Sequence, residues 1–202
     1  MAYSVHKNIV MIYALTGTLQ EKGGNRFVIE VGGVSFDLRS SANSVKSLPQ
    51  VGEKVKVLTY LHVREDALEL YGFLDAAERD LFQMLIGVSG IGPKSALGIL
   101  GIEQVENLKA AISEGRTELL TKASGIGTKT AERIILELRT KLVQPGSEKI
   151  VGIMESDHDI VEALVNLGYG KSQARNALTR IDPKVTKMED RIREALQLLK
   201  SK

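Results

Sequence analysis

The amino-acid sequence predicts an α+β protein of several domains: an N-terminal β-barrel, a central all-α domain with a repeated hairpin, and a C-terminal three-helix domain. Three observations support this. The first third of the chain is rich in β-branched residues between turn glycines, the rest follows a helical period, and a Pro-Gly-Ser stretch interrupts that period. The expected divisions are an N-terminal extension at 1–10, the barrel at 11–74, the helical domain at 75–143, a flexible linker at 144–156 and the three-helix domain at 157–202.

The first domain is expected to contain short strands and one short helix. The strands are expected at Ile12–Leu19, Arg26–Val31, Val34–Leu38, Lys54–Val63 and Ala67–Phe73, and the helix at Ser41–Leu48. Turn residues separate them, among them Gly23-Gly24-Asn25 and Gly32-Gly33. A small closed barrel such as an OB-fold accommodates strands of this number and length, because closure hides the sheet edges.

The central domain is expected to begin with a capped helix. Asp75-Ala-Ala-Glu78 resembles a capping box, with Asp75 as the N-cap. The apolar stripe after it consists of Leu81, Phe82, Leu85 and Ile86. Further helices are expected at Pro93–Leu100, Gln104–Glu114, Thr117–Lys122 and Thr128–Leu142.

The C-terminal domain comes after the linker, whose stretch Gln144–Glu155 shows little periodicity. Its first helix begins at Asp157 and ends at Gly168-Tyr-Gly170, and its second spans Ser172–Ile181. Asp182-Pro183 breaks the second helix, and Thr186-Lys-Met-Glu189 resembles a capping box for the third. The apolar stripes of the first and third helices are Ile160, Leu164 and Leu167, and Ile192, Leu196 and Leu199.

The composition excludes several classes of protein. The 202 residues include 27 Lys and Arg against 25 Asp and Glu, so a net charge of +2 excludes binding to nucleic acid through bulk charge. Because the chain has no Cys, it has no disulfides, Cys-ligated zinc, iron–sulfur cluster or catalytic thiol. His6, His62 and His158 are far apart, so we expect no metal site and no cofactor. Without a signal peptide or a long apolar run, a cytoplasmic protein is expected.

The most informative feature is a duplication. Ser89-Gly-Ile-Gly92-Pro-Lys-Ser-Ala96 recurs as Ser124-Gly-Ile-Gly127-Thr-Lys-Thr-Ala131, 35 residues later (89 to 124). Each copy predicts an apolar helix, a tight Gly-Ile-Gly turn and a second helix, with the isoleucine of the turn packed between the two helices. The glycines allow positive φ and close approach of another backbone.

Such a turn favours phosphate binding, because successive N–H groups lie at the start of a helix, where the helix dipole also attracts an anion. Lys94 and Lys129 come just after the two turns and can reach a nearby phosphate. A single copy is equally well explained as a plain helical corner, whereas two copies with the same lysine favour the phosphate interpretation. Contacts to phosphate carry no base information, so the motif predicts binding specific for DNA structure rather than DNA sequence.

Alternative functions are less well supported. Gly87 to Ser95 imitates a nucleotide-binding phosphate loop, but Pro93 displaces Lys94 and no strand precedes the loop. A hairpin-containing glycosylase or nuclease needs a catalytic carboxylate, and no Asp lies between Asp80 and Asp157. We therefore expect no catalytic residues. An enzyme of that kind, and a protein-interaction scaffold in which the hairpins are only structural, remain open.

The sequence also resembles the RuvA family, the Holliday-junction-binding subunits of the bacterial branch-migration complex. The resemblance runs from Met11 to the C-terminus. It rests on Ile29-Glu-Val-Gly-Gly33, Val63-Arg-Glu-Asp-Ala67, Leu70-Tyr-Gly-Phe73, both Gly-Ile-Gly hairpins and Lys129-Thr-Ala-Glu-Arg133. The family usually begins at the equivalent of Met11, so the first ten residues are assigned no function.

The resemblance implies a non-catalytic subunit that binds four-way junctions as a homotetramer, or as an octamer of two tetramers. It implies two protein partners, the hexameric ATPase RuvB, which would hydrolyse the ATP, and the resolvase RuvC, and it implies a location at the bacterial nucleoid. The implied phosphate contacts are Gly90, Ile91, Gly92, Lys94, Gly125, Ile126, Gly127, Lys129 and Arg133.

The resemblance implies two further sites. Glu65 and Asp66 match the family's acidic pin, whose carboxylates would repel phosphates at the crossover, although an ordinary hairpin turn also favours such residues. The three-helix domain matches the RuvB-binding domain and also resembles ubiquitin-associated modules. Its candidate motor contacts are Leu164, Leu167 and Tyr169, although most apolar residues of so small a domain must form its own core.

Overall fold

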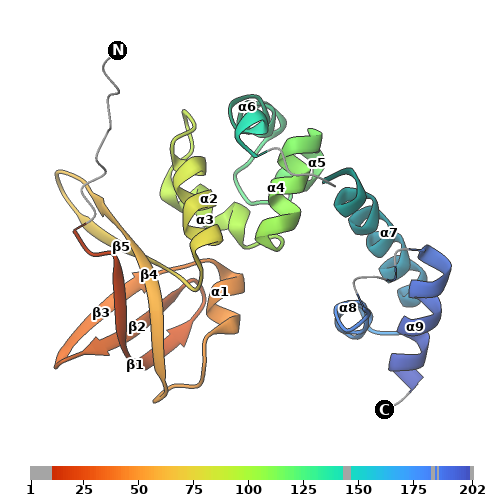
Figure 1. Cartoon of the computed structure of the whole chain (residues 1–202), viewed down its shortest axis with the longest axis horizontal. Coiled ribbons are helices and arrows are strands. Elements are labelled where there is room, and N and C mark those ends of the chain that lie inside the picture. Colours follow the sequence, from red (N-terminus) through yellow and green to blue (C-terminus); the bar gives the residue numbers. More distant parts are fainter. Residues whose placement is uncertain (1–10, 143–146, 183–184, 186, 201–202) are drawn as a thin grey trace. The chain divides into compact units, whose positions relative to one another are not determined.

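The structure of this chain is a computed structural model that describes residues 11–142, 147–182, 185 and 187–200. The chain divides into two compact units, and the boundary between them lies between residues 142 and 143. In Figure 1 the first unit runs from red to teal and the second from teal to blue. The predicted extension at 1–10 and residues 143–146 of the predicted linker lie outside the described residues.

The first unit begins with a closed five-stranded barrel in the order β1-β2-β3-β5-β4, which confirms the predicted barrel. Its strands are β1 (Ala14–Gly23), β2 (Arg26–Val31), β3 (Val34–Arg39), β4 (Lys54–Val63) and β5 (Leu68–Phe73). The β3–β5 pair is parallel and closes the barrel, and the other pairs are antiparallel. Helix α1 (Ala42–Ser47) lies between β3 and β4 in the chain.

Strand β1 differs from its prediction, because it extends to Gly23 rather than ending at Leu19. It pairs with β4 along its first half and with β2 along its second half, and a register shift between Leu19 and Glu21 separates the two. A bulge of this kind lets one long strand bend from one partner to the other. Leu19, Phe27, Ile29 and Leu38 from three strands are almost completely buried in the barrel.

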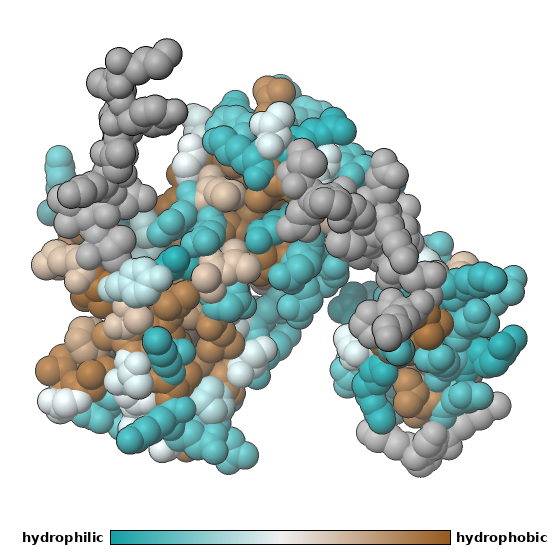
Figure 2. Space-filling model, viewed as in Figure 1, coloured by the Kyte–Doolittle hydropathy of each residue, from teal (hydrophilic) through white to brown (hydrophobic). Residues whose placement is uncertain are grey.

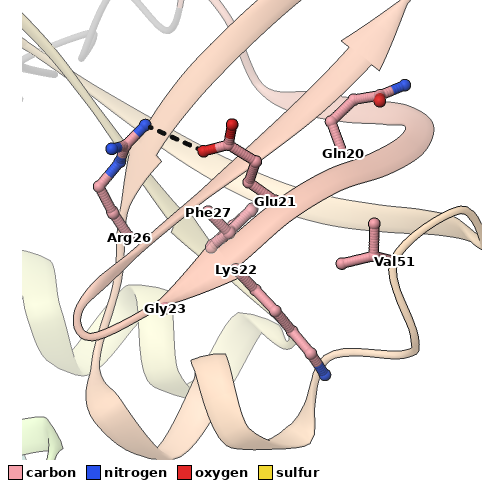
Figure 3. A pocket seen from close by; sticks show the side chains of 7 residues that line it. All are labelled: Gln20, Glu21, Lys22, Gly23, Arg26, Phe27 and Val51. Atoms are coloured by element: carbon pink, nitrogen blue, oxygen red, sulfur yellow. Dashed lines mark ion pairs between the residues drawn. The ribbon is translucent and has the colours of Figure 1, made fainter.

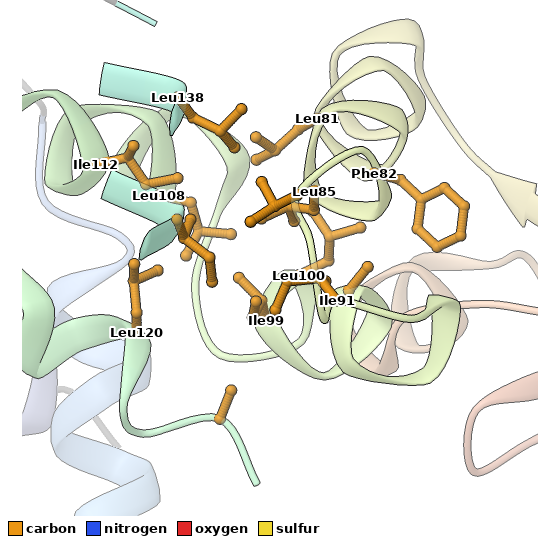
Figure 4. Packing of buried hydrophobic residues seen from close by; sticks show 14 of the residues in the cluster. Leu81, Phe82, Leu85, Ile91, Ile99, Leu100, Leu108, Ile112, Leu120 and Leu138 are labelled. Atoms are coloured by element: carbon orange, nitrogen blue, oxygen red, sulfur yellow. The ribbon is translucent and has the colours of Figure 1, made fainter. Parts of the chain in front are cut away.

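The helical domain contains the two predicted hairpins. Its helices are α2 (Ala76–Ile86), α3 (Pro93–Leu100), α4 (Val105–Glu114), α5 (Thr117–Leu120) and α6 (Thr128–Leu138), and the 3₁₀ turn η1 (Arg139–Lys141) comes after them. The helix predicted at Thr128–Leu142 is therefore α-helical only to Leu138 and continues as a 3₁₀ turn. Figure 4 shows Leu81 and Leu85 facing Leu108 and Leu138 in one shared core.

The barrel and the helical domain pack directly against each other. Phe82 of α2 lies 5.5 Å from Tyr60, 5.1 Å from Tyr71 and 5.0 Å from Phe73, measured between ring centroids. The Asn43 side-chain amide donates to the carbonyls of Leu100 (3.1 Å) and Glu103 (3.2 Å). The helical domain is therefore held to the barrel by both apolar and polar contacts.

Asp75 caps α2 as predicted, since its carboxylate accepts from the Glu78 N–H at 2.8 Å. The Glu78 side chain does not reach back to Asp75. It is buried and accepts instead from the hydroxyls of Ser41 and Ser44, so the expected capping residue becomes a polar link to the barrel.

The second unit is a three-helix domain formed by α7 (Ser147–Asn166), α8 (Lys171–Leu178) and α9 (Met188–Lys200). Its helix α7 corrects the predicted linker at 144–156, which is helical from Ser147 onward. Pro145-Gly146 led to the prediction of a linker, whereas the helix begins directly after them at Ser147, in a segment that includes the helix formers Glu148 and Lys149. Pro183 and Thr186 of the predicted breaker and capping box lie outside the described residues.

An ion pair joins the first and third helices of this domain. Arg191 of α9 donates to both carboxylate oxygens of Asp157 at 2.7 Å and to the Val185 carbonyl at 2.8 Å. Around it, Ile160, Leu164, Ala177 and Ala195 form the apolar core. None of the described helices has both the length and the apolar composition needed to cross a membrane.

Candidate nucleic-acid interface

The two Gly-Ile-Gly turns have the same backbone conformation. The first glycine of each turn has a positive φ, +86° at Gly90 and +83° at Gly125. The second glycine is an extended N-cap, with φ −88° and ψ 169° at Gly92 and φ −85° and ψ 170° at Gly127. The duplication in sequence is thus a duplication in structure, and only the first glycine of each pair needs its freedom at positive φ.

The isoleucine of each turn is buried between the helices, as predicted. Ile91 and Ile126 are both 5% exposed and belong to the helical core. The Ile91 N–H donates to the Val88 carbonyl at 3.0 Å, and the Ile126 N–H donates to the Ala123 carbonyl at 3.1 Å. These side chains therefore anchor the turns from inside and do not offer a surface for DNA. Because their N–H groups are also bonded inside the turns, the two isoleucines offer no free donor to DNA.

Each turn leaves donors free at the start of a helix. Neither Gly92 nor Gly127 supplies a side-chain cap to α3 or α6. In the part of the chain that the structure describes, the N–H groups of Gly92, Lys94, Gly127 and Lys129 have no hydrogen-bond acceptor. Free N–H groups at the positive end of a helix dipole attract an anion, and phosphate oxygens are suitable acceptors.

The second glycine of each turn is not required by the fold. A Cβ atom built on Gly92 or Gly127 would meet nothing within 4 Å, and a negative φ suits any residue. Glycine therefore leaves a backbone surface bare on the outside of the turn. A phosphate group could approach these amides without meeting a side chain.

The basic side chains near the turns lie on the outside of the domain. Lys94 and Lys129 are both exposed at the first turns of α3 and α6. Arg133 lies one turn further along α6, and its Nη1 donates to the Ser89 carbonyl of the first hairpin at 3.1 Å. This bond brings the two hairpins side by side, and nothing in the sequence alone indicated it.

The predicted acidic pin occupies the turn between β4 and β5. The turn is closed by the Arg64 N–H, which donates to the Ala67 carbonyl at 2.9 Å. Glu65 and Asp66 are exposed, and the Asp66 carboxylate lies 3.3 Å from Nε of Arg64. The structure thus places the two carboxylates at the tip of a barrel hairpin, on an element separate from the Gly-Ile-Gly turns.

A polar network supports the base of this barrel hairpin. The Tyr71 hydroxyl donates to the Glu69 carboxylate at 2.7 Å, and Arg39 forms an ion pair with Glu69 at 3.0 Å. The hydrogen bond from Tyr71, with the positive charge of Arg39, lowers the pKa of Glu69. Burial, together with the bond to Glu69, raises the pKa of Tyr71. At neutral pH the network therefore consists of an ionised Glu69 and a neutral Tyr71.

The three candidate motor contacts of the tail differ in accessibility. Leu164 is 1% exposed and belongs to the core of its own domain, so it offers no surface to a partner. Leu167 is 66% exposed beside Gly168, whose φ of +94° ends α7. Tyr169 is half-buried against the same core. Leu167 is therefore the most accessible of the three.

A hollow on the barrel is less suited to bind an anion. Figure 3 shows that Lys22, Arg26 and Val51 line it together with neighbouring residues of β1. Arg26 is paired with Glu21 at 3.7 Å and Asp37 at 3.1 Å, and the Lys22 amine donates to the Leu48 carbonyl at 2.7 Å. Because both cations already have partners, we assign this hollow no role.

Comparison with protein families covers most of the chain. The model of the RuvA N terminal domain matches residues 11–72, that of the SAM-like Helix-hairpin-helix tandem matches 82–140, and that of the RuvA C-terminal domain matches 158–200. A Methylibium petroleiphilum protein is 43% identical over 191 residues, covering 94% of this chain and 99% of its own length. This chain belongs to the RuvA family.

Other members of the RuvA family show a similar relationship. A Neisseria meningitidis protein is 43% identical over 193 residues, covering 94% of this chain and 99% of its own length. A Dehalococcoides mccartyi protein is 41% identical over 194 residues, covering 95% of this chain and its own full length. All three relatives are named Holliday junction branch migration complex subunit RuvA. The family assignment agrees with the resemblance seen in the sequence.

Proposed function

We propose that this protein binds four-way junction DNA through its paired hairpins and serves as the DNA-recognition subunit of a branch-migration complex. The observation that carries the proposal is the presence of two turns of equal conformation, each with free amides, in one domain. Two phosphate sites at a fixed spacing recognise the shape of a backbone and not its base sequence. The names of the RuvA relatives support the junction as that shape.

The proposed phosphate contacts are backbone amides and basic side chains. The amides are those of Gly90, Gly92, Gly125 and Gly127, which donate to no carbonyl in the described part of the chain, and the side chains are Lys94, Lys129 and Arg133. Ile91 and Ile126 would hold the turns in shape and donate nothing to phosphate, because their side chains are buried and their N–H groups are already bonded. Since amides bind phosphate without carrying a charge, this site is compatible with a net charge of only +2.

We propose that Glu65 and Asp66 act by repulsion at the crossover of the junction. Both carboxylates are exposed at the tip of a β-hairpin, where negative charge disfavours the close approach of phosphates. Replacement of both with Lys is expected to strengthen binding to all DNA. The expected change is a smaller preference for the junction over a linear duplex, and an unchanged preference would exclude a role in discrimination.

The decisive experiment is a binding competition between a four-way junction and a linear duplex of equal length and sequence content. The proposed function predicts a clear preference for the junction at the same salt concentration, since salt alone changes DNA affinity strongly. Equal affinities would overturn it. Cleavage of either DNA by the purified protein would instead support the alternative of a nuclease.

We propose that the three-helix domain recruits the ATPase RuvB, with Leu167 and Tyr169 at the contact, and that the catalytic step belongs to RuvB. The observation in support is the large exposed side chain of Leu167 on a small domain that has its own core. A protein that ends at Leu142 retains the first compact unit. It is expected to bind junctions normally and to lose stimulation of RuvB. RuvC is proposed as a further partner in the same complex at the nucleoid.

A homotetramer, alone or as an octamer of two tetramers, is proposed as the assembly that receives four DNA arms. Figure 2 shows hydrophobic side chains gathered over much of the visible barrel surface, which is suited to contacts between copies of the chain. The mass in solution, measured by light scattering with and without junction DNA, tests this. A monomer at all concentrations would contradict it.

A further inference from the structure

Two large apolar side chains lie exposed just below the acidic tip of the β4–β5 hairpin. Val63 is 64% exposed and Leu68 is 73% exposed. They face each other directly, since Val63 of β4 is the register partner of Leu68 of β5. Cross-strand partners lie close enough for their side chains to form a single surface.

This apolar pair continues the inner face of the barrel beyond its rim. Two residues closer to the barrel on each strand, Leu61 is paired with Leu70, and both pack into the barrel core. Side chains two apart on a strand point to the same face, so Val63 and Leu68 extend that face past the end of the core. The opposite face of the hairpin carries Tyr60, which packs on Phe82. Beyond Leu61 and Leu70, the inner face is therefore bare.

The charges beside the pair restrict what could cover it. Arg64 is paired with Asp66, and Glu65 has no ion-pair or hydrogen-bond partner in the described part of the chain. The tip thus carries one excess negative charge, which repels a phosphate backbone. Nucleobases have uncharged, apolar faces, and proteins insert apolar side chains such as Leu and Ile against base steps that have been unstacked.

The hairpin tip and the first Gly-Ile-Gly turn lie on the same side of the first unit. In Figure 1 the tip is at the upper left of the barrel, and the yellow-green loop between α2 and α3 projects upward to its right. The packing of Tyr60 and Tyr71 against Phe82 fixes the hairpin to α2. DNA held at the amides of the first Gly-Ile-Gly turn would therefore pass on the side to which the β4–β5 tip projects.

We propose that Val63 and Leu68 form an apolar platform for the nucleobases that lose their stacking at the crossover of a bound junction. The carboxylates at the tip keep phosphates away, and the apolar pair below them receives the base faces. This inference rests on the proposed function, because it requires a bound junction. It assigns to the tip an attraction for bases in addition to the repulsion of phosphates.

The test uses the full-length protein and junctions that carry 2-aminopurine, a fluorescent base whose emission rises when it is unstacked. One junction carries the probe at the crossover and another carries it within an arm. The variant is Val63→Thr with Leu68→Asn, which keeps the side-chain shapes but makes them polar. The control is Val34→Thr with Leu136→Asn, at two other exposed apolar residues that are 55% and 81% exposed.

The wild type and the control are expected to raise the emission of the crossover probe and to leave the arm probe unchanged. The Val63 and Leu68 variant is expected to lose at least about half of that rise, because the unstacked base loses its apolar contact. The preference of this variant for the junction over a duplex should remain, since the amides of the Gly-Ile-Gly turns are intact.

Three results would overturn the platform. One is a full rise in emission with the variant, and another is an equal loss with the control. The third is a change in the solution mass of the variant, which would show that the pair contacts a second copy of the chain. Failure of the proposed function is distinct, because the wild type itself would then show no preference for the junction.

Discussion

The two Gly-Ile-Gly hairpins have the same backbone but different surroundings. Helix α3 of the first hairpin is fixed to the barrel, since the Asn43 amide donates to the carbonyl of Leu100 at its C-terminal end and to that of Glu103 just beyond it. Helix α6 of the second hairpin exposes most of its outer face, including Arg133 and the 81% exposed Leu136. The first hairpin is therefore an anchored site, and the second carries additional side chains on an open helix.

This difference shows how a duplicated motif can divide its roles. The turn itself is set by local residues, so both copies leave the same N–H groups without an acceptor in the described part of the chain. The surroundings of the helix after each turn are set by the barrel, which covers α3 but not α6. The Arg133 bond to Ser89 then joins the open copy to the anchored one. We expect the two hairpins to respond alike to changes in the turn and differently to changes beyond it.

The largest effect is expected at the buried isoleucines. Ile91→Ala and Ile126→Ala each remove a core side chain, and each should lower the free energy of unfolding of the first unit by about 2–5 kcal/mol. Urea denaturation monitored by circular dichroism measures this. Equal losses would confirm that the two turns are anchored alike, whereas a loss below about 1 kcal/mol at either site would contradict its place in the core.

The second prediction separates stability from binding. Gly92→Asp and Gly127→Asp add an N-cap side chain in open space, so the unfolding free energy should rise by about 0.5–1 kcal/mol. The same carboxylate occupies the free amides and repels phosphate, so junction affinity should fall at least about tenfold, or ~1.4 kcal/mol.

The matched controls for the two Asp variants are Gly92→Asn and Gly127→Asn, because Asn caps the helix without adding charge. A smaller loss of affinity with Asn would show that charge repulsion contributes, and an equal loss would show that occupation of the amides suffices. Unchanged affinity in a stable Asp variant would remove that hairpin from the DNA site. Fluorescence anisotropy with labelled junctions provides the measurement.

The third prediction concerns the anchor of the first hairpin alone. Asn43→Ala removes both hydrogen bonds to the end of α3 and should lower the unfolding free energy by about 1–2 kcal/mol. Junction affinity should decrease with Asn43→Ala, because the position of the first turn is then less well defined. Arg139 makes a similar side-chain bond, to the Ser113 carbonyl at 2.8 Å, and Arg139→Ala offers the matched control at the second hairpin.

The smallest effect on stability is expected at Arg133. Arg133→Met removes one exposed hydrogen bond to Ser89 and should change the unfolding free energy by no more than about 1 kcal/mol. If Arg133 also neutralises a phosphate, the slope of log affinity against log salt should become shallower by about 0.9. Weaker binding with an unchanged slope would instead assign it to positioning the hairpins.

Much of the fold could be predicted from the sequence because it depends on local patterns. The bounds of β2, β4 and α3 are those expected from alternation, turn glycines and Pro93 at the first position of a helix. The path of β1 could not be predicted, because its second half is paired with β2 and not with β4. The helix that begins at Ser147 was missed because Pro145-Gly146 suggested a linker.

The candidate site shows the same division. The repeated Ser-Gly-Ile-Gly and its lysines were visible in the sequence, and so was the burial of the two isoleucines. Leu164 was misjudged as an available contact, because a periodic stripe does not show which of its members face the core. The roles of Asn43 and Arg133 depend on contacts between residues 57 and 44 positions apart, for which the sequence carries no local signal.

By itself, the sequence determined the type of the domains, the two Gly-Ile-Gly turns and the family. Each of these depends on residues near one another in the chain or on a repeated pattern. The tertiary structure decided which hairpin is anchored, where Glu78 directs its carboxylate and that Val63 and Leu68 remain uncovered. These features depend on which distant surfaces meet, and close packing between domains decides that only when the whole chain is folded.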